Sequence, residues 1–157
     1  MTSDLHGDEA RLRELVGVGC DTEERARLER TLERDSGFLE RWFLPLERQA
    51  LGAAPDPVGL ALQLFCLKEA AIKALWAQHQ VGPDSVECRW SSDAGWSLRL
   101  LPGRRGLQLE GQAGLEGDLG WARVLAWQGP EARTETGRDS SRPALGFGDQ
   151  GTPETLR

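Results

Sequence analysis

The alternation of hydrophobic and polar residues divides the chain into a short apolar run, a helical region and a region of period two. The run at residues 15–20, LVGVGC, is typical of a short buried strand. Gly17 and Gly19 lie within it, and glycine in a strand often marks a place where another backbone comes close. We therefore expect this strand to pack tightly against a neighbouring element.

Four segments after this strand have the spacing or the punctuation of helices. Leucines four residues apart predict a surface helix in the polar stretch 21–34, and the aromatic-rich segment 38–43 predicts a short helix or turn. Proline suits the first helical position, so Pro45 predicts a third helix that runs to about residue 51. The longest helix is expected at residues 58–80, where leucines and alanines repeat at helical spacing.

The remaining ordered part of the chain has the period of strands. The predicted strands are residues 85–90, 96–101, 107–110 and 121–127. Trp90 and Trp96 flank the first intervening loop and can pair across a hairpin. A strand, then helices, then several strands predict an α+β fold, with one long helix and short helices packed on a small antiparallel sheet.

Length and composition favour a single domain with two unstructured ends. The 157 residues are enough to bury a self-sufficient core. Residues 1–14 are mostly polar and predict a flexible segment, whereas residues 129–157 combine few large apolar side chains with many Gly, Pro, Ser and Thr, which predicts a disordered tail. The folded domain is then expected at residues 15–128.

The charge balance and the cysteines limit the classes of protein to which the chain can belong. The net charge is −6, from 19 basic and 25 acidic residues, whereas a nucleic-acid binder needs a dominant basic face. The sequence has no apolar run near the ~20 residues of a membrane span. Cys20, Cys66 and Cys88 are odd in number and lie in apolar surroundings, so we expect buried, reduced thiols and a cytoplasmic protein.

The two basic residue types are used very unequally. There are 17 arginines and only 2 lysines, and the lysines lie close together at positions 68 and 73. A compact ammonium and a wide planar guanidinium are not interchangeable where geometry matters. This distribution favours a special role for Lys68 and Lys73, and the alternative is chance.

Two clusters of charged residues have the composition of a metal and phosphate site. Asp21 and Glu23 follow the apolar run two positions apart, which on an extended chain puts both carboxylates on one side. In the long helix, Glu69 and Lys73 share a face, and Lys68 projects about 100° away from Glu69. Three carboxylates suit Mg²⁺ and lysines suit phosphate oxygens, a combination that favours phosphoryl-type transfer.

A purely structural interpretation is also consistent with these residues. Glu69 and Lys73 at this spacing can form an ordinary helix ion pair worth about 0.3–0.5 kcal/mol. Asp21 can then be merely a helix cap. Residue types and spacing leave both interpretations open.

The same residues lie in two segments that resemble the signature motifs of the phosphopantetheinyl transferases. The first segment is GVGCDTE at residues 17–23, and the second is FCLKEAAIKAL at residues 65–75. The intervening FLERWFLPLE at residues 38–47 is similar to the linking segment of that family, and the whole resemblance covers about residues 16–127. The acidic pair in the first motif is closer to the enterobactin- and surfactin-synthetase type than to the small holo-acyl-carrier-protein synthases.

This resemblance implies an enzyme that moves the 4′-phosphopantetheine arm of coenzyme A, its co-substrate, to a serine of an acyl or peptidyl carrier protein. Such reactions serve fatty acid, polyketide and nonribosomal peptide biosynthesis. By position, Asp21, Glu23 and Glu69 would hold Mg²⁺, and Glu69 would also activate the serine hydroxyl. Lys68 and Lys73 would contact the phosphates.

The resemblance also carries implications for partners. Arg27 matches a position that helps to dock the acidic carrier protein in the small synthases, which are single-half chains that form trimers with sites between subunits. This chain matches only one half of the larger type, and it has no Ser-His motif of the kind that the family uses near coenzyme A. We therefore expect a homodimer, a homotrimer or a partner half-domain. The alternative is a catalytically degenerate half-domain that acts as a binding or partner subunit.

Overall fold

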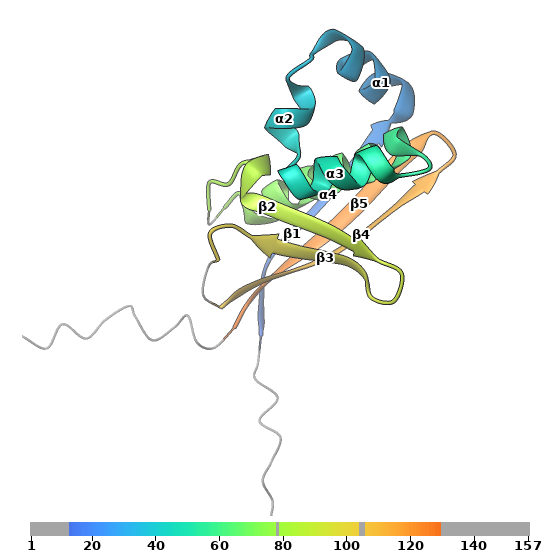
Figure 1. The fold of residues 1–157 in the computed structure, drawn as a ribbon. Coiled ribbons are helices and arrows are strands. Elements are labelled where there is room, and N and C mark those ends of the chain that lie inside the picture. Colours follow the sequence, from blue (N-terminus) through green and yellow to red (C-terminus); the bar gives the residue numbers. More distant parts are fainter. Residues whose placement is uncertain (1–12, 78, 104–105, 130–157) are drawn as a thin grey trace, which may run out of the picture.

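The structure is a computed structural model that describes residues 13–77, 79–103 and 106–129. The described chain has the expected α+β fold, a five-stranded antiparallel sheet with helices packed against it (Figure 1). Residues 1–12 of the predicted flexible segment (1–14) and residues 130–157 of the predicted tail (129–157) lie outside the described residues, so both remain predictions, although Glu14 already belongs to the first strand.

Strands and helices follow one another in the predicted order of strand, helices and strands. The strands are β1 (Glu14–Glu24), β2 (Val86–Ser91), β3 (Gly95–Leu100), β4 (Leu107–Glu116) and β5 (Leu119–Gln128). The helices are α1 (Arg25–Arg34), α2 (Phe38–Trp42), α3 (Pro45–Ala53), α4 (Pro57–Leu75) and the 3₁₀ turn η1 (Pro83–Ser85).

The strand order of the sheet is β1-β5-β4-β3-β2, so the first and last described strands are neighbours. They run antiparallel from Glu14 opposite Gln128 to Glu24 opposite Leu119. β1 is consequently an edge strand, and the acidic residues of the first motif lie near the end of this edge.

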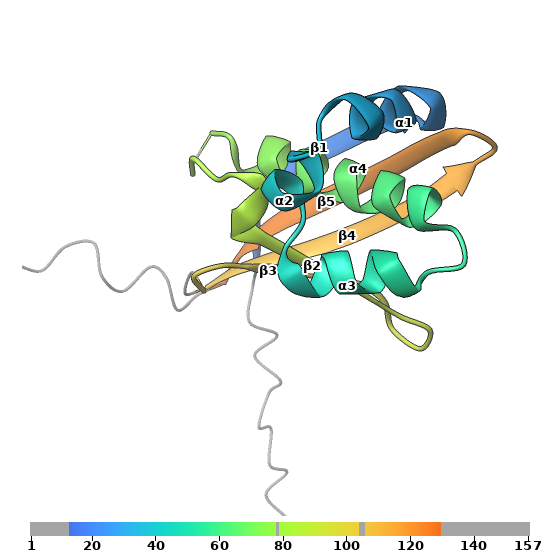
Figure 2. The same cartoon turned by 45° about the horizontal axis from the view of Figure 1, so that its top comes forward.

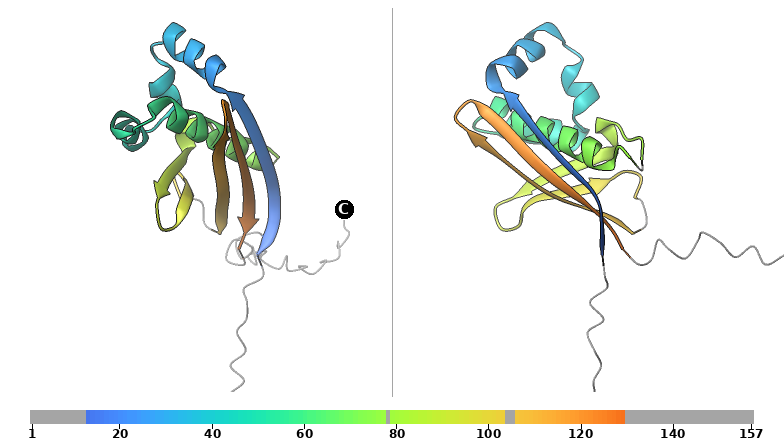
Figure 3. Two further views of the ribbon diagram at one scale, coloured as in Figure 1. Left: turned by 90° about the vertical axis from the view of Figure 1, so that its right-hand side faces the viewer. Right: turned by 180° about the vertical axis from the view of Figure 1, so that it is seen from behind.

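Helix α4 crosses one face of the sheet, where it contacts β1, β5 and β4 (Figure 2). The other helices lie on the same side of the sheet (Figure 3). Leu62, Leu67 and Leu75 of α4 are fully buried in this layer, together with Val86 of β2 and Val124 of β5. Because each such side chain contributes roughly 1.5–3 kcal/mol when it is buried, α4 is fixed firmly on the sheet.

The close backbone approach predicted at the glycines of β1 is confirmed. A Cβ atom on Gly17 would overlap the carbonyl oxygen of Ala74, and one on Gly19 would overlap that of Ala70. Only glycine lets a strand and a helix come this close, since any side chain would push the two elements apart. These contacts bring the end of β1 directly beside the second motif on α4.

The prediction of a helix over residues 21–34 is wrong in its first turn. Residues 21–24 continue β1, and Asp21 is paired with Ala122 and Glu23 with Gly120 of β5. Helix α1 begins only at Arg25. The ladder with β5 decides this boundary, and β5 lies about a hundred residues away in the sequence, where no local pattern can report it.

Other boundaries differ by smaller amounts. The long helix ends at Leu75 rather than near residue 80, and β4 extends to Glu116 rather than Glu110 because it continues to pair with β5. The predicted hairpin pair is confirmed, since Trp90 lies opposite Trp96 with ring centroids 5.4 Å apart.

The cysteines are free, as expected, but they are not all buried. Cys66 and Cys88 lie in the core, whereas Cys20 is exposed, because it alternates with Gly19 and faces away from α4. Among the described residues, no helix is both long and apolar enough to cross a membrane.

Candidate active site

Two carboxylates at the end of β1 face the helical layer. Asp21 and Glu23 continue the side of the strand that carries Gly19, so both side chains point toward α4 and α1 rather than toward the open face. Their side chains are only 13% and 11% exposed. Carboxylates buried to this extent need partners, and each finds a different one.

Asp21 pairs with Lys73 of α4. The Lys73 ammonium lies 2.6 Å from Asp21 Oδ1 and donates a second hydrogen bond of 3.3 Å to the carbonyl oxygen of Cys20. The hydrogen bond that Lys73 donates to Asp21 is the main cause that raises the pKa of Lys73, so the ammonium stays charged. Half of the Lys73 side chain is nevertheless exposed, which leaves it accessible from solvent.

Glu69 lies one turn before Lys73 on the same face of α4 and completes this cluster. Its pKa is raised, first by partial burial and then by the negative charge of Asp21, while Lys73 acts in the opposite direction. The two carboxylates are therefore close enough to repel each other. Asp21, Glu69 and Lys73 form one electrostatic unit, which we call the acidic cluster.

Glu23 does not join the acidic cluster in this structure. Its Oε1 atom accepts a hydrogen bond of 2.8 Å from the backbone N–H of Glu24, and its Oε2 atom lies 3.6 Å from Nε of Arg27. Within the described part of the chain, no three His, Cys, Asp or Glu side chains form a group that could hold a metal ion. The predicted set of three carboxylate ligands is thus not assembled.

Two carboxylates still fit a magnesium ion. Mg²⁺ is usually held by one or two protein carboxylates, with water and substrate phosphates in its other positions. Asp21 and Glu69 repel each other, and a divalent cation between them would relieve that repulsion. Their donor set therefore suits Mg²⁺ delivered together with a phosphorylated ligand.

A buried thiol lies next to the acidic cluster. The Cys66 thiol is fully buried and close enough to Asp21 to interact with its charge. Burial is the main cause that raises the pKa of this thiol to about 12, and the charge of Asp21 adds to it. Cys66 therefore remains a protonated, neutral thiol beside Asp21, a proximity that the sequence did not indicate.

Lys68 lies elsewhere, contrary to the prediction that it contacts phosphates. Its side chain is fully buried, and its ammonium lies 2.9 Å from Glu47 Oε2, 2.7 Å from the Pro83 carbonyl oxygen and 2.5 Å from the Val86 carbonyl oxygen. These three contacts use all the donors of an ammonium group. Lys68 thus ties α4 to α3 and β2 and has no donor left for a ligand.

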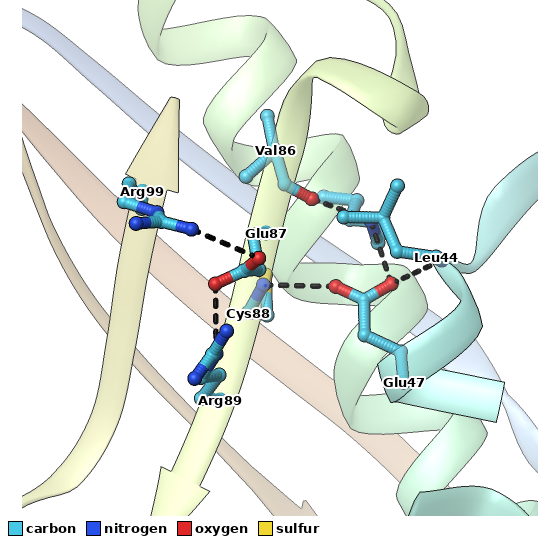
Figure 4. Close-up of polar contacts among 8 residues, drawn as sticks. Leu44, Glu47, Val86, Glu87, Cys88, Arg89 and Arg99 are labelled. Carbon is cyan, nitrogen blue, oxygen red and sulfur yellow. Dashed lines mark hydrogen bonds and ion pairs between the residues drawn. The ribbon is translucent and has the colours of Figure 1, made fainter. Parts of the chain in front are cut away.

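Glu47, the partner of Lys68, is a second residue that sequence reasoning missed. Figure 4 shows its carboxylate between α3 and β2, where it accepts hydrogen bonds from the backbone N–H groups of Leu44 (2.7 Å) and Cys88 (2.8 Å). The signal was available in part, since an acidic residue two positions after Pro45 is typical of a capped helix start. Its pairing with Lys68 is a tertiary contact without a local signature.

Next to Glu47, a second buried carboxylate faces the surface. Figure 4 shows Glu87 of β2 between Arg89 and Arg99, at 2.7 Å and 3.3 Å, respectively. These arginines hold the pKa of Glu87 below its ordinary value against the opposing effect of burial. The group stabilises the β2–β3 hairpin and has no contact with the acidic cluster.

Helix α1 begins beside the acidic cluster and is fixed at its first residue. The Arg25 guanidinium makes two hydrogen bonds, of 3.0 Å and 2.6 Å, to the carboxylate of Asp56, which caps α4 through the N–H of Gly59. Two residues further along α1, the Arg27 side chain is 71% exposed. The starts of α1 and α4 are thereby locked together, with Arg27 at the surface near Glu23.

Comparison with known proteins gives a consistent result. A family model described as the 4′-phosphopantetheinyl transferase superfamily matches residues 17–123. The holo-[acyl-carrier-protein] synthase of Kocuria rhizophila is 46% identical over 63 residues, which are 40% of this chain and 46% of that protein. The synthase of the same name from Trichlorobacter lovleyi is 29% identical over 97 residues, 55% of this chain and 77% of that protein.

Solved structures agree with the fold. The holo-acyl-carrier-protein synthase of Plasmodium yoelii superposes with a TM-score of 0.64 at 18% identity, over 74% of this chain and 98% of that one. The synthase of Helicobacter pylori, solved with coenzyme A, gives 0.60 at 23% identity, over 69% and 98%. These relatives carry the name of the small synthases, although the acidic pair of β1 resembles the larger type more.

Proposed function

This chain belongs to the 4′-phosphopantetheinyl transferase superfamily, and on that basis we propose that it transfers the phosphopantetheine arm of coenzyme A to a serine of an acyl or peptidyl carrier protein. One observation carries the proposal. The two signature segments, far apart in the sequence, meet where the Lys73 ammonium lies 2.6 Å from Asp21 and one turn from Glu69. Charged residues that only keep a surface solvated would not have to meet from two distant segments in this way.

We assign Mg²⁺ to Asp21 and Glu69, where it would neutralise charge on the pyrophosphate of coenzyme A. Lys73 would contact a phosphate oxygen as a mobile point charge. Glu23 would join these ligands only if it released the Glu24 amide and Arg27, with which it now interacts. Lys68 has a structural role in this proposal, because its ammonium is fully occupied by Glu47 and two carbonyl oxygens.

The proposed reaction is a displacement at the β-phosphorus of coenzyme A. The serine oxygen forms a bond to this phosphorus, and the bond to the bridging oxygen breaks, so that adenosine 3′,5′-bisphosphate leaves with the electron pair. Glu69 takes the serine proton, directly or through a water molecule.

The carrier protein is expected to dock on α1. Carrier proteins of this kind are acidic, and α1 presents basic side chains, among them Arg27, which is 71% exposed beside Glu23. A docked serine would then approach Asp21 and Glu69 on the helical side of β1. Electrostatic complementarity of this type mainly raises the association rate and depends on salt.

We further propose that the active protein is a homodimer or homotrimer, or has a partner half-domain. A ligand as long as coenzyme A needs walls on several sides, whereas the acidic cluster lies at an edge strand of one small sheet. The sheet face opposite α4 carries apolar side chains, including Val18 at 60% exposure. Such a surface is typical of an interaction site.

The central test is binding and transfer with altered carboxylates. Asp21→Ala and Glu69→Gln are expected to abolish Mg²⁺-dependent binding of coenzyme A, measured by calorimetry, without loss of the folded state. Glu40→Gln is the matched control, because Glu40 is an exposed carboxylate of α2 paired with Arg48. Binding by the two site variants that equals wild type would rule out the metal assignment.

A second assay on the wild-type protein distinguishes a transferase from a catalytically degenerate half-domain that only binds a partner. Incubation with labelled coenzyme A, Mg²⁺ and several apo-carrier proteins should add the mass of one phosphopantetheine arm to a carrier. Tight carrier binding without any gain in mass would instead favour a binding or partner subunit.

A further inference from the structure

Without a divalent cation, the acidic cluster already holds a positive charge of its own. The Lys73 ammonium lies 2.6 Å from Asp21 Oδ1, the carboxylate oxygen that we assign to the metal. A metal ligand cannot accept this ion pair and coordinate a cation with the same oxygen at full strength, because two positive charges would meet there. Cation binding at Asp21 must therefore displace or weaken the contact of Lys73.

The Lys73 side chain is free to change its partner. Half of its side chain is exposed, and four flexible carbon atoms separate the ammonium from the helix. Its second hydrogen bond, to the Cys20 carbonyl oxygen, is long at 3.3 Å. Lys68 on the same helix is the opposite case, since it is fully buried and bonded at 2.5–2.9 Å to three oxygen atoms.

We propose that Lys73 is the resident counter-ion of the cation-free site and that its transfer from Asp21 to a phosphate couples the binding of the divalent cation to that of coenzyme A. This inference rests on the metal site proposed above. With the cation alone, the freed ammonium loses a carboxylate partner and gains none. With coenzyme A present, the pyrophosphate supplies a new anionic partner, so each ligand strengthens the binding of the other.

Coupling of this kind has a consequence for the order of events. The cation alone binds weakly, and coenzyme A alone finds Lys73 already engaged with Asp21. The two ligands are therefore expected to occupy the site mainly together, and neither stays bound for long without the other. Glu69 contributes to the same balance, because Lys73 also interacts electrostatically with its carboxylate.

The test uses Mn²⁺ as a probe for the cation site, with free Mn²⁺ measured by electron paramagnetic resonance. Titrations are made without coenzyme A and at saturating coenzyme A, in the absence of carrier protein, with a correction for Mn²⁺ bound to coenzyme A in solution. Lys73→Met removes the ammonium and keeps most of the side-chain volume. Arg48→Met, on α3, removes an equal charge outside the acidic cluster.

Wild type and Arg48→Met should bind Mn²⁺ weakly alone and at least about fivefold more tightly with coenzyme A. Lys73→Met should bind Mn²⁺ alone at least about fivefold more tightly than wild type and gain less from coenzyme A. Suppose that wild type binds Mn²⁺ with coenzyme A while Lys73→Met, without coenzyme A, binds Mn²⁺ no more tightly than wild type does. In that case the counter-ion inference is wrong and the metal site stands. If wild type binds no Mn²⁺ under either condition, both fail.

Discussion

Gly19 of β1 and Ala70 of α4 approach so closely that a Cβ atom on the glycine would overlap the alanine carbonyl oxygen and lie 2.7 Å from the backbone nitrogen of Ala74. Glu69 immediately precedes Ala70, and Asp21 lies two residues after Gly19. The separation of strand and helix at this point therefore determines the distance between the two carboxylates of the acidic cluster.

Gly19→Ala is expected to destabilise the domain by about 3 kcal/mol or more, because the obstacle is helix backbone that cannot turn aside. Gly52 of α3 is the matched control, since a Cβ atom there would meet nothing within 4 Å. Gly52→Ala should stabilise the protein by about 0.4–1 kcal/mol. Urea unfolding measures both, and equal effects at the two glycines would refute the close-packing argument.

Lys68→Met should cost about 3–5 kcal/mol, because it leaves the Glu47 carboxylate buried without its counter-charge. The double variant Glu47→Gln/Lys68→Met removes both charges and keeps an acceptor for a backbone N–H, so it should recover at least about 1 kcal/mol of this loss. Coenzyme A affinity of folded Lys68→Met should equal that of wild type. A large loss of affinity would instead support a phosphate contact by Lys68.

Lys73→Arg should leave the melting temperature nearly unchanged, since charge and helix propensity persist. Transfer to a carrier protein should fall at least about tenfold, roughly 1.4 kcal/mol of transition-state stabilisation, because a planar guanidinium does not fit where a compact ammonium does. The measurement is kcat/KM for transfer of the labelled arm. An unchanged value would return Lys73 to the role of an ordinary ion-pair partner.

The pair of Arg25 and Asp56 should make stability depend on pH in the acidic range. The hydrogen bonds from Arg25 lower the pKa of Asp56 to about 2, below the value of about 3.8 for an unpaired carboxyl. A lowered pKa contributes stability that is complete above the unfolded value and is lost as the pH falls toward 2. Asp56→Asn keeps the helix cap but removes the charge. Its free energy of unfolding should therefore be lower than that of wild type at pH 7, and this difference should shrink below pH 4. A difference that stays constant with pH would contradict this account.

Self-association should depend on Val18 if the sheet face opposite α4 is an interface. Its side chain is 60% exposed in the single chain, and Val18→Asp would place a charge on this apolar surface. Sedimentation should give a dimer or trimer for wild type and smaller species for this variant, with a parallel loss of transfer. Leu46→Asp, at another exposed apolar position on α3, should change neither. A strictly monomeric wild type that still transfers the arm would disprove the proposed assembly.

The sequence by itself determined the helix and strand content, the close approach at Gly17 and Gly19, and the face of α4 that carries Glu69 and Lys73. Each of these depends on local period or on the special conformational freedom of one residue type, and both are visible without a partner. The α+β class follows from the order of the periods alone.

Only the tertiary structure decided which charged residues meet. Helix geometry alone puts Lys68 and Lys73 about 140° apart around α4. Only the tertiary structure shows that Lys68 points into the core onto Glu47 and Lys73 onto Asp21 at the surface. The extension of β1 through Asp21 and Glu23 likewise depends on its ladder with β5, at the far end of the described chain. Period tells which face of an element a residue occupies, but what packs against that face is set by contacts between residues distant in the sequence.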